Sequence, residues 1–299
     1  MKKLIDYIKE AKEGGYGLGH FNVSDLATLR GVVEGFKEAR ELFKKDMAVI
    51  VGVSEGERNF IGLKQIVALT RSYQEEGIPV FLNADHTKSL EKVKEAAESG
   101  FDAILFDAGK ESFEENIKRT KEAVETIKTV NRDIIVEGEL GFLGEGSKVR
   151  TTIPEGVDLS LESLTSPEEA FRFLNESGVD LLAPAVGNIH GVIKDETGAF
   201  YSPVIDVNRI AAIAEIVKAP LVLHGGSGIK DEELAAAVRA GMTIVHISTE
   251  IRLAWRKNLE NYLEANAEEI APYKLLQGST DAIKDLVFQK LKLLNSVLY

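Results

Sequence analysis

Five histidines are the clearest candidates for chemistry in this sequence, because each lies within or directly after a short apolar run. His86, His190 and His224 follow such runs, and His20 and His246 lie inside two others. Imidazole is the commonest metal ligand among side chains. Three convergent histidines that leave one coordination position open are typical of a catalytic zinc site. We therefore expect a metal site where the apolar runs end together.

A glycine-rich stretch directly after one of these histidines predicts a phosphate site. Gly225, Gly226, Ser227 and Gly228 follow His224, and a segment of helical period comes next. Small residues let the backbone approach an anion closely, and consecutive amide groups before a helix can bind phosphate. A plain glycine turn is the alternative, and it is weakened by the candidate metal ligand beside it.

Carboxylates lie near the candidate ligands. Asp85 precedes His86 directly, so beside a metal it is a candidate general acid or base. Its alternative role is to orient a histidine. Asp107 and Glu139 each end a further apolar run. They could provide an alternative metal position or orient the imidazoles.

Eight apolar runs alternate with segments of helical period, and this alternation predicts the scaffold. We expect strands at 17–23, 48–53, 79–84, 103–107, 134–139, 181–186, 221–224 and 243–247. Helices are expected at 26–45, 90–99, 112–130, 167–177, 205–217 and 231–240. The strands lack strict alternation, as expected for strands buried on both faces. The repeats predict an α/β fold, a (β/α)8 TIM barrel, in which the carboxyl ends of the strands meet at one mouth. An open doubly wound sheet is the alternative, but no glycine-rich dinucleotide motif follows the first run.

The rest of the chain adds little to this plan. We expect one domain over residues 1–299, with further helices from 255 to 299 beyond the barrel. The stretch 144–165 has many Gly, Ser and Thr residues and follows the fifth predicted strand. Its position on the active-site side predicts a mobile lid.

The composition of the chain disfavours certain classes of binding partner. The chain has 299 residues, 44% of them hydrophobic, and a formal net charge of −12. This acidic balance disfavours nucleic acid and anionic membranes as partners. The chain contains no cysteine, which excludes thiol chemistry. The apolar runs are too short to cross a bilayer and the first residues lack a signal peptide, so we expect a cytoplasmic protein.

Taken together, these segments resemble the class II, zinc-dependent ketose-bisphosphate aldolases, which include the fructose- and tagatose-bisphosphate enzymes. The resemblance covers nearly the whole chain, and its most specific parts are the Asp85-His86 pair and the stretch from His224 to Ile229. The matching segments are Gly19-His20-Phe21-Asn22-Val23, Ala84-Asp85-His86, Ile104-Leu105-Phe106-Asp107, Val136-Glu137-Gly138-Glu139-Leu140-Gly141, Asn188-Ile189-His190-Gly191 with Lys194, His224-Gly225-Gly226-Ser227-Gly228-Ile229 and Thr249-Glu250-Ile251-Arg252.

The resemblance implies a role for each matching residue. One zinc ion per subunit is expected on His86, His190 and His224, often with a monovalent cation, Na⁺ or K⁺, near the substrate phosphate. Asp85 is expected to move the proton of the substrate C4 hydroxyl. Glu145 is the nearest candidate for the family's loop glutamate, and Asp107 and Glu139 match carboxylates near an alternative metal position. Substrate and phosphate contacts are expected from Asn22, Ser54, Gly191, Lys194, Gly225, Gly226, Ser227, His246, Ser248 and Thr249. A sugar phosphate as ligand and a homodimer or homotetramer are also implied.

Two positions depart from the family pattern and leave the substrate open. His246 replaces an asparagine that contacts the dihydroxyacetone part of the substrate. Ala271-Pro272-Tyr273 replaces Asp-Pro-Arg, whose arginine reaches a neighbouring subunit's distal phosphate. Arg58 or Lys148 could bind that phosphate instead.

Fructose 1,6-bisphosphate is the default substrate. The alternatives are tagatose bisphosphate, a ketose 1-phosphate without a distal phosphate, and a non-catalytic role in binding sugar phosphates. A metal-dependent hydrolase is disfavoured, because such enzymes often carry His-x-His on the first strand and this chain has only His20 there.

Overall fold

In the computed structural model, which describes residues 1–195, 197 and 200–296, eight parallel strands close into a barrel. Their hydrogen-bonded order is β1-β11-β10-β7-β5-β4-β3-β2. These strands are β1 (Leu18–Asn22), β2 (Val49–Val53), β3 (Val80–Thr87), β4 (Ala103–Phe106), β5 (Ile135–Leu140), β7 (Leu181–Pro184), β10 (Leu221–Leu223) and β11 (Met242–Ile247). The predicted barrel and its eight strands are confirmed, with bounds that differ by a few residues at most.

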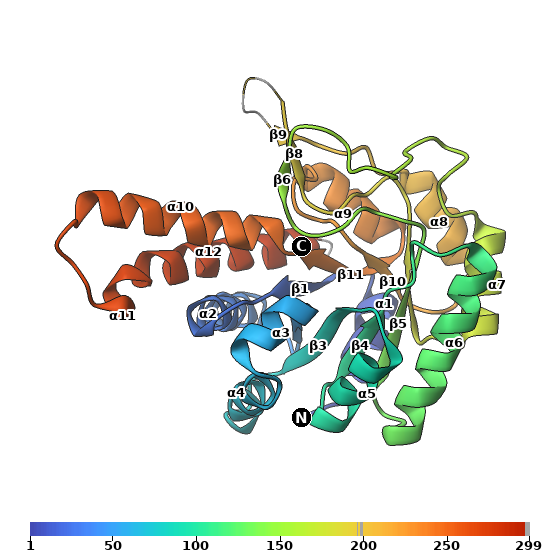
Figure 1. Ribbon diagram of the computed structural model, residues 1–299, viewed down its shortest axis with the longest axis horizontal. Helices are drawn as coiled ribbons and strands as arrows, with labels where there is room; N and C mark the ends of the chain where they lie inside the picture. Colours follow the sequence, from blue (N-terminus) through green and yellow to red (C-terminus); the bar gives the residue numbers. More distant parts are fainter. Residues whose placement is uncertain (196, 198–199, 297–299) are drawn as a thin grey trace.

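Helices surround the barrel (Figure 1). They are α2 (Leu26–Phe43), α3 (Glu55–Ile61), α4 (Leu63–Glu75), α5 (Leu90–Ser99), α6 (Phe113–Val130), α7 (Pro167–Ser177), α8 (Val207–Ile216) and α9 (Asp231–Ala240). The six predicted helices are confirmed, but α3 and α4 were not foreseen. The short α3 buries Glu57 and Arg58 rather than apolar side chains, so it gives no apolar periodic signal. In α4, Ile66 is buried and Leu63, Val67, Leu69 and Tyr73 pack half-buried against the core, so its sequence carries a helical pattern that the prediction overlooked.

The barrel interior changes from apolar to polar along the strands. Near the amino ends, Leu18, Ile50 and Phe81 pack against α1 (Leu4–Gly14), a further helix that the sequence analysis missed. Residues two apart on a strand face the same side. The next inward positions are therefore the polar or small residues His20, Gly52, Asn83, Glu137, His224 and His246. This layer forms the floor of the site described below.

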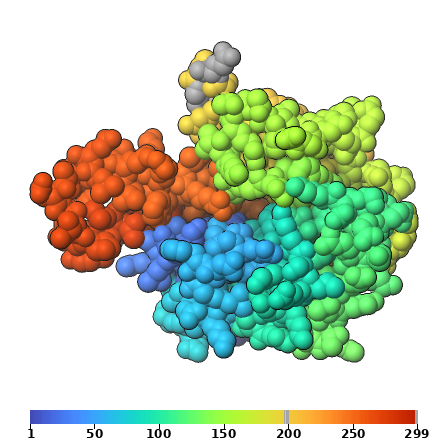
Figure 2. Space-filling view, viewed as in Figure 1, coloured from blue at the N-terminus to red at the C-terminus, as the bar shows by residue number. Residues whose placement is uncertain are grey.

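The C-terminal helices form an arm that projects from the barrel (Figures 1 and 2). It consists of α10 (Thr249–Ala265), α11 (Pro272–Leu275) and α12 (Gln277–Leu294), which confirms the predicted helices beyond the barrel. Gly35 of α2 lets α12 pack closely, because a Cβ there would overlap the carbonyl of Lys284. The tip of the arm is exposed: Ile270 and Tyr273 have exposed fractions of 86% and 74%.

A second, small sheet joins the loops after β5 and β7. It contains β6 (Val149–Arg150), β8 (Val192–Lys194) and β9 (Phe200–Tyr201), in the order β6-β8-β9. The predicted lid, 144–165, therefore includes a short strand paired with β8, and its mobility stays a prediction. No helix within the described ranges is long and apolar enough to cross a membrane.

Candidate active site

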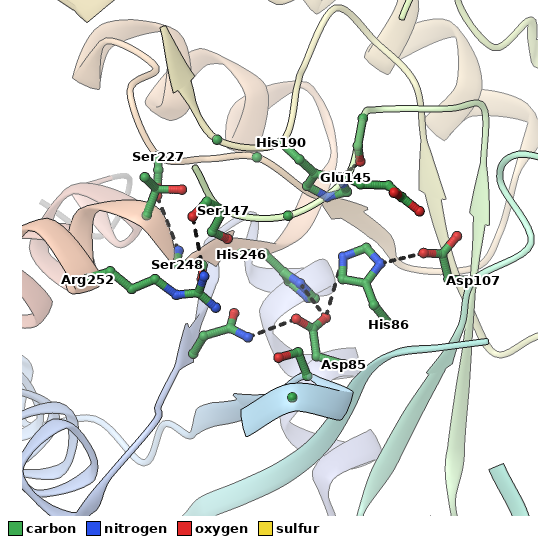
Figure 3. Close-up of a pocket in the computed structure, with 18 of the residues that line it drawn as sticks. Asp85, His86, Asp107, Glu145, Ser147, His190, Ser227, His246, Ser248 and Arg252 are labelled. Atoms are coloured by element: carbon green, nitrogen blue, oxygen red, sulfur yellow. Dashed lines mark hydrogen bonds and ion pairs between the residues drawn. The ribbon is translucent and has the colours of Figure 1, made fainter. Parts of the chain in front are cut away.

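A cavity of about 390 Å³ opens at the carboxyl ends of the barrel strands. Figure 3 shows side chains from several strands and loops pointing into it. The predicted residues that line it are Asn22, Ser54, Asp85, His86, Asp107, Glu145, His190, Gly191, Gly225, Ser227, His246, Ser248 and Thr249. His224 and Glu139 are buried at its base, with exposed fractions of 0% and 2%.

His86, His190 and His224 converge, although they lie on three different segments of the chain. Their ring centroids are 4.7 Å (His86–His190), 5.2 Å (His86–His224) and 5.5 Å (His190–His224) apart. Glu139 joins them, and one donor atom from each of the four residues lies within 4.8 Å of the others. Three imidazole nitrogens and one carboxylate oxygen suit a zinc ion.

Each of these imidazoles has one nitrogen held by an acceptor outside the cluster. Nδ1 of His86 lies 2.9 Å from Asp107 Oδ2, and Nδ1 of His190 lies 2.7 Å from the carbonyl oxygen of Gly144. Nε2 of His224 lies 2.6 Å from Glu137 Oε1. The opposite nitrogen of each ring is left for the centre of the cluster. Metal-binding histidines usually have such outer partners, which fix the tautomer and the ring orientation.

Two buried polar atoms at the centre of the cluster face only each other. Nδ1 of His224 and Oε2 of Glu139 lie 2.9 Å apart as an ion pair. Within the described part of the chain, neither atom has a hydrogen bond of good geometry. Buried polar groups are normally satisfied, and an unpaired one is costly. A metal ion between these atoms would satisfy both, so the residues fit the implied zinc.

The charges of the cluster also favour a cation. Burial disfavours a charged His86, but the carboxylates of Asp85 and Asp107 outweigh it and raise its pKa to about 9. Glu137 and Glu139 likewise raise the pKa of His224 well above its ordinary value, against the effect of burial. The carboxylates thus stabilise positive charge on His86 and His224, from a proton or from a bound metal, whereas burial lowers the pKa of His190 to about 4 and favours its neutral, metal-binding form.

A break in β3 brings Asp85 and His86 to the same cavity. The register between β3 and β4 shifts between Ala84 and Thr87, and His86 has a φ of 45°. In a regular strand, adjacent side chains point to opposite faces. The left-handed backbone at His86 removes that restriction. Such strained conformations in non-glycine residues cluster at functional sites.

Arg58 supports this break in the strand. Its guanidinium donates to the carbonyl oxygen of Asp85 (3.4 Å), to that of Val53 (3.2 Å) and to Thr87 Oγ1 (3.0 Å). Its exposed fraction is 1%. The suggestion that Arg58 binds a distal phosphate is therefore wrong, because its side chain is buried among backbone carbonyls. Lys148, the other candidate, lies outside the set of described residues that line the cavity.

Asp85 is held on one side and open on the other. The Nδ2 of Asn22 donates to Asp85 Oδ2 (2.9 Å) and to Glu57 Oε2 (3.1 Å). Oδ1 of Asp85 is buried without a hydrogen-bond partner among the described residues. Although burial opposes it, the imidazoles of His86 and His20 lower the pKa of Asp85. Asp85 is therefore an ionised carboxylate with one oxygen free to accept a proton.

Glu57 is a buried carboxylate that the sequence analysis did not single out. Besides Asn22, it accepts hydrogen bonds from Ser54 Oγ (2.8 Å) and from Arg252 Nη2 (2.7 Å). Arg252 lines the cavity one helical turn beyond Ser248 and Thr249. Its place in the matched segment from Thr249 to Arg252 was the only signal for it.

The glycine-rich turn after β10 meets the start of α10. Ser227 Oγ accepts hydrogen bonds from the backbone N–H groups of Ser248 and Glu250, both at 3.2 Å. Gly225 has a φ of 63°, and a Cβ there would overlap the carbonyl of Ile189. Only glycine fits such a position, which leaves backbone and hydroxyl groups at the cavity wall.

Two predicted phosphate contacts, Gly226 and Lys194, are outside the set of described residues that line the cavity. The backbone N–H of Gly226 donates to the carbonyl oxygen of His246 at 2.9 Å. The ammonium of Lys194 lies 5.0 Å from the centroid of the Phe200 ring, and Lys194 is outside the described lining of the cavity. Among the described residues, the lysine and arginine side chains that line the cavity are Lys88 and Arg252.

Glu145 lies at the rim of the cavity, as the predicted loop position requires. Its Oε1 is 2.8 Å from Lys88 Nζ and 2.9 Å from Lys110 Nζ. These two ammonium groups lower the pKa of Glu145. Half of its side chain is exposed, so the rim can rearrange without a large loss of buried contacts.

The remaining two histidines form a stack at the base of the cavity. His20 and His246 have ring centroids 3.5 Å apart and planes inclined by 5°. His246 lines the cavity with an exposed fraction of 6%, whereas His20 is fully buried. Burial lowers the pKa of His20 to about 4. The sequence analysis gave His20 no specific role, and the structure places its ring against His246.

Comparison with known proteins gives the same picture for the whole chain. A family model described as "Fructose-bisphosphate aldolase class-II" matches residues 2–297. A fructose-bisphosphate aldolase of Thermus caldophilus is 32% identical over 317 residues, covering 98% of this chain and 97% of that protein. One from Geobacillus stearothermophilus is 31% identical over 296 residues, covering 98% and 95%.

Solved structures agree with the fold. The YdjI aldolase from Escherichia coli K12 superposes with a TM-score of 0.79 at 28% identity, covering 99% of this chain and 98% of that one. A structure described as a putative fructose-1,6-bisphosphate aldolase from Coccidioides immitis gives 0.78 at 23% identity, covering 99% and 96%. At that identity the second likeness concerns the fold alone.

Proposed function

Because this chain belongs to the class II fructose-bisphosphate aldolase family, we propose that it reversibly cleaves a ketose phosphate, by default fructose 1,6-bisphosphate. The products are dihydroxyacetone phosphate and an aldehyde such as glyceraldehyde 3-phosphate. One observation carries the proposal: three imidazoles converge, and each is hydrogen-bonded to an acceptor outside the cluster. Beside them, Asp85 has one carboxylate oxygen without a hydrogen-bond partner among the described residues.

His86, His190 and His224 are the residues that would hold the zinc on which the family depends, with Glu139 beside them. Asp107 and Glu137 orient two of the rings, so they support the site from outside it. When bound there, zinc supplies a Lewis acid that stabilises the negative charge left on oxygen by carbon–carbon cleavage. The proposal assigns one zinc per subunit.

Asp85 is the proposed acceptor of the C4 hydroxyl proton. Its Oδ1 is free, and Asn22 holds its other oxygen, so the carboxylate is ionised and fixed. Glu145 is proposed to protonate the carbon left behind after cleavage. It must first leave Lys88 and Lys110, whose ammonium groups favour its ionised form, and take up a proton from solvent, which it then passes to the carbon. Both roles are general acid–base catalysis.

The phosphate of the three-carbon half is proposed to rest on Gly191, Gly225, Ser227, Ser248 and Thr249, which all line the cavity. A small cavity wall of amide and hydroxyl donors suits a phosphate near a helix start. Gly226, Lys194 and a monovalent cation, Na⁺ or K⁺, remain proposed members of this subsite. Asn22, Ser54 and His246 are the proposed contacts for the sugar part.

The distal group of the substrate is the open part of the proposal. Tyr273 lies at the exposed tip of the arm, and it is outside the described lining of the cavity of its own chain. A homodimer or homotetramer is proposed, in which this tip lies near the cavity of a neighbour. Tyrosine there lacks the guanidinium group of arginine, which can bind a phosphate through two hydrogen bonds. A ketose 1-phosphate without a distal phosphate is therefore the favoured alternative substrate.

The test is a turnover assay with measured zinc content. Zinc-loaded wild-type protein is assayed with fructose and tagatose bisphosphates and with several ketose 1-phosphates. We expect cleavage of at least one of them, and loss of both zinc and cleavage in H224A. Sugar-phosphate binding without cleavage would support a non-catalytic relative, and full activity of metal-free H224A would overturn the proposal.

A further inference from the structure

The stacked pair of histidines follows directly from the strand register. His20 of β1 and His246 of β11 are partners in the parallel ladder. Both side chains point into the barrel, where their rings lie nearly parallel at 3.5 Å. Two aromatic rings at this distance and angle are in full face-to-face contact. Each ring therefore restricts the rotation of the other.

A second metal site is the first explanation to consider for this pair. His20, Asp85 and His246 each have a donor atom within 4.8 Å of the others. However, the lone pairs of an imidazole lie in the plane of its ring. Two parallel planes 3.5 Å apart do not share a point, so a single ion cannot lie in both. The stack excludes these two rings as joint ligands of one metal.

His20 is itself fixed from two sides. The Nδ2 of Asn83 donates to His20 Nε2 at 3.0 Å, which places the proton of the neutral ring on Nδ1. Gly52 on the neighbouring strand leaves the space that the ring occupies, because a Cβ there would overlap His20 Cε1. The ring can neither turn nor shift toward β2. The His20 ring is therefore a fixed surface against which His246 stacks.

His246 is enclosed on both faces and faces carboxylates at its edges. Its second face stacks on His224, with centroids 4.3 Å apart and planes inclined by 21°. Nδ1 lies 3.7 Å from Asp85 Oδ1, and Nε2 lies 3.8 Å from Glu137 Oε2. These distances are too long for direct hydrogen bonds. Both residues line the cavity, so a substrate oxygen there can lie beside this pair and contact His246 Nδ1 next to Asp85.

We propose that His20 is a positioning residue, whose stacked ring holds His246 in the one orientation in which its nitrogen meets the substrate beside Asp85. The inference rests on the proposed aldolase function for its kinetic consequence. His246 is then the group that contacts the substrate, and His20 acts only through it. Asn83 and Gly52 contribute to the same positioning of His246, because they fix the ring of His20.

Side-chain nitrogen NMR tests the positioning without any turnover. The chain has five histidines, so ¹⁵N-histidine labelling of the zinc-loaded protein gives few signals. In the wild type we expect His20 with a protonated Nδ1 and an unprotonated Nε2, and His246 in one tautomer. In H20A and in N83A, the two His246 nitrogen signals should move toward each other as the ring samples both tautomers. Unchanged His246 signals in both variants would overturn the proposal.

A double-mutant cycle tests the functional consequence. H20A, H246N and the double variant are compared in kcat and KM on the preferred ketose phosphate, at equal zinc content. In the wild-type background, which keeps His246, we expect H20A to lower kcat/KM about tenfold. In the H246N background we expect H20A to lower it less than twofold, as for residues in contact. An equal loss in both backgrounds would indicate a purely structural role for His20 and would overturn the proposal.

The two experiments separate the possible failures. If the wild-type protein cleaves no ketose phosphate, the proposed function fails, and the NMR result still decides whether His20 fixes His246. If H20A does not fold, N83A keeps the buried ring and removes only its anchor. The N83A signals then decide the question alone.

Discussion

His86 Nδ1 donates a hydrogen bond to Asp107 Oδ2 over 2.9 Å, and this contact determines which nitrogen of His86 is free for a metal. Asp107 is itself fixed, since its Oδ1 accepts the backbone N–H of Gly109 at 3.2 Å. The orientation of the ligand therefore depends on a residue that lies outside the group of four donors. Comparable outer contacts hold His190 and His224.

Removal of the Asp107 carboxylate should weaken zinc binding. In D107A, His86 loses the acceptor that fixes its ring, and loss of such partners typically lowers metal affinity by about 10–100-fold. Competition with a chromogenic chelator measures the affinity. D133A is the matched control, because Asp133 pairs with Lys3 on the surface. Equal zinc affinity in D107A and D133A would contradict this role.

Replacement of Asp85 by asparagine should separate binding from catalysis. The D85N side chain keeps its size but cannot accept a proton, so kcat should fall by about 10²–10⁴-fold. Zinc content should stay near one ion per chain, because Asp85 is not among the four grouped donors. Steady-state kinetics with metal analysis gives both quantities. Cleavage by D85N at the wild-type rate would show that another group takes the proton.

Arg58 should matter for stability rather than for substrate binding. R58M leaves the carbonyl of Asp85 and the hydroxyl of Thr87 without their donor, and unsatisfied buried groups cost about 1–3 kcal/mol each. Urea unfolding should therefore give a lower midpoint for R58M. R172A, which removes an exposed arginine paired with Glu114, should leave the midpoint almost unchanged. A similar midpoint for R58M and the wild type would contradict a stabilising role for the hydrogen bonds of Arg58.

Zinc uptake should release protons near neutral pH. Without metal, the pKa of His86 is raised from 6.5 to about 9. Protonation of His86 then stabilises the metal-free fold fully below pH 6.5, and this stability is lost as the pH rises through about 9. Zinc competes with that proton, so binding at pH 7 releases it. Calorimetry in two buffers of different ionisation enthalpy counts the protons, and a count of zero at pH 7 would contradict the raised pKa.

The barrel was predictable because its signal repeats. Eight apolar runs separated by helical segments have few alternatives to a closed parallel barrel, and the strands differ from their predicted bounds by a few residues. The small sheet of β6, β8 and β9 was not predictable in the same way. Two of its strands have only two residues, and their pairing depends on contacts between loops distant in sequence.

The part of the candidate site that lies at the ends of strands was predictable. His86, His190, His224 and Asp85 follow apolar runs, so a barrel must bring them together. Other members depend on side-chain geometry that residue order does not encode. Glu57 reaches the cavity from α3, a helix with little apolar periodicity.

The stacking of His20 on His246 required the register of β1 against β11, which the sequence leaves open. The sequence also could not show that Arg58 is buried and that Lys194 faces Phe200. Both of these outcomes depend on which way a long side chain turns after its backbone is placed.

Anomalous diffraction at the zinc edge, from crystals grown with zinc, tests the central claim most directly. The account predicts one strong peak per chain, within coordination distance of His86 Nε2, His190 Nε2 and His224 Nδ1. A principal peak between His20, Asp85 and His246, or a peak that avoids the three imidazoles, would contradict it.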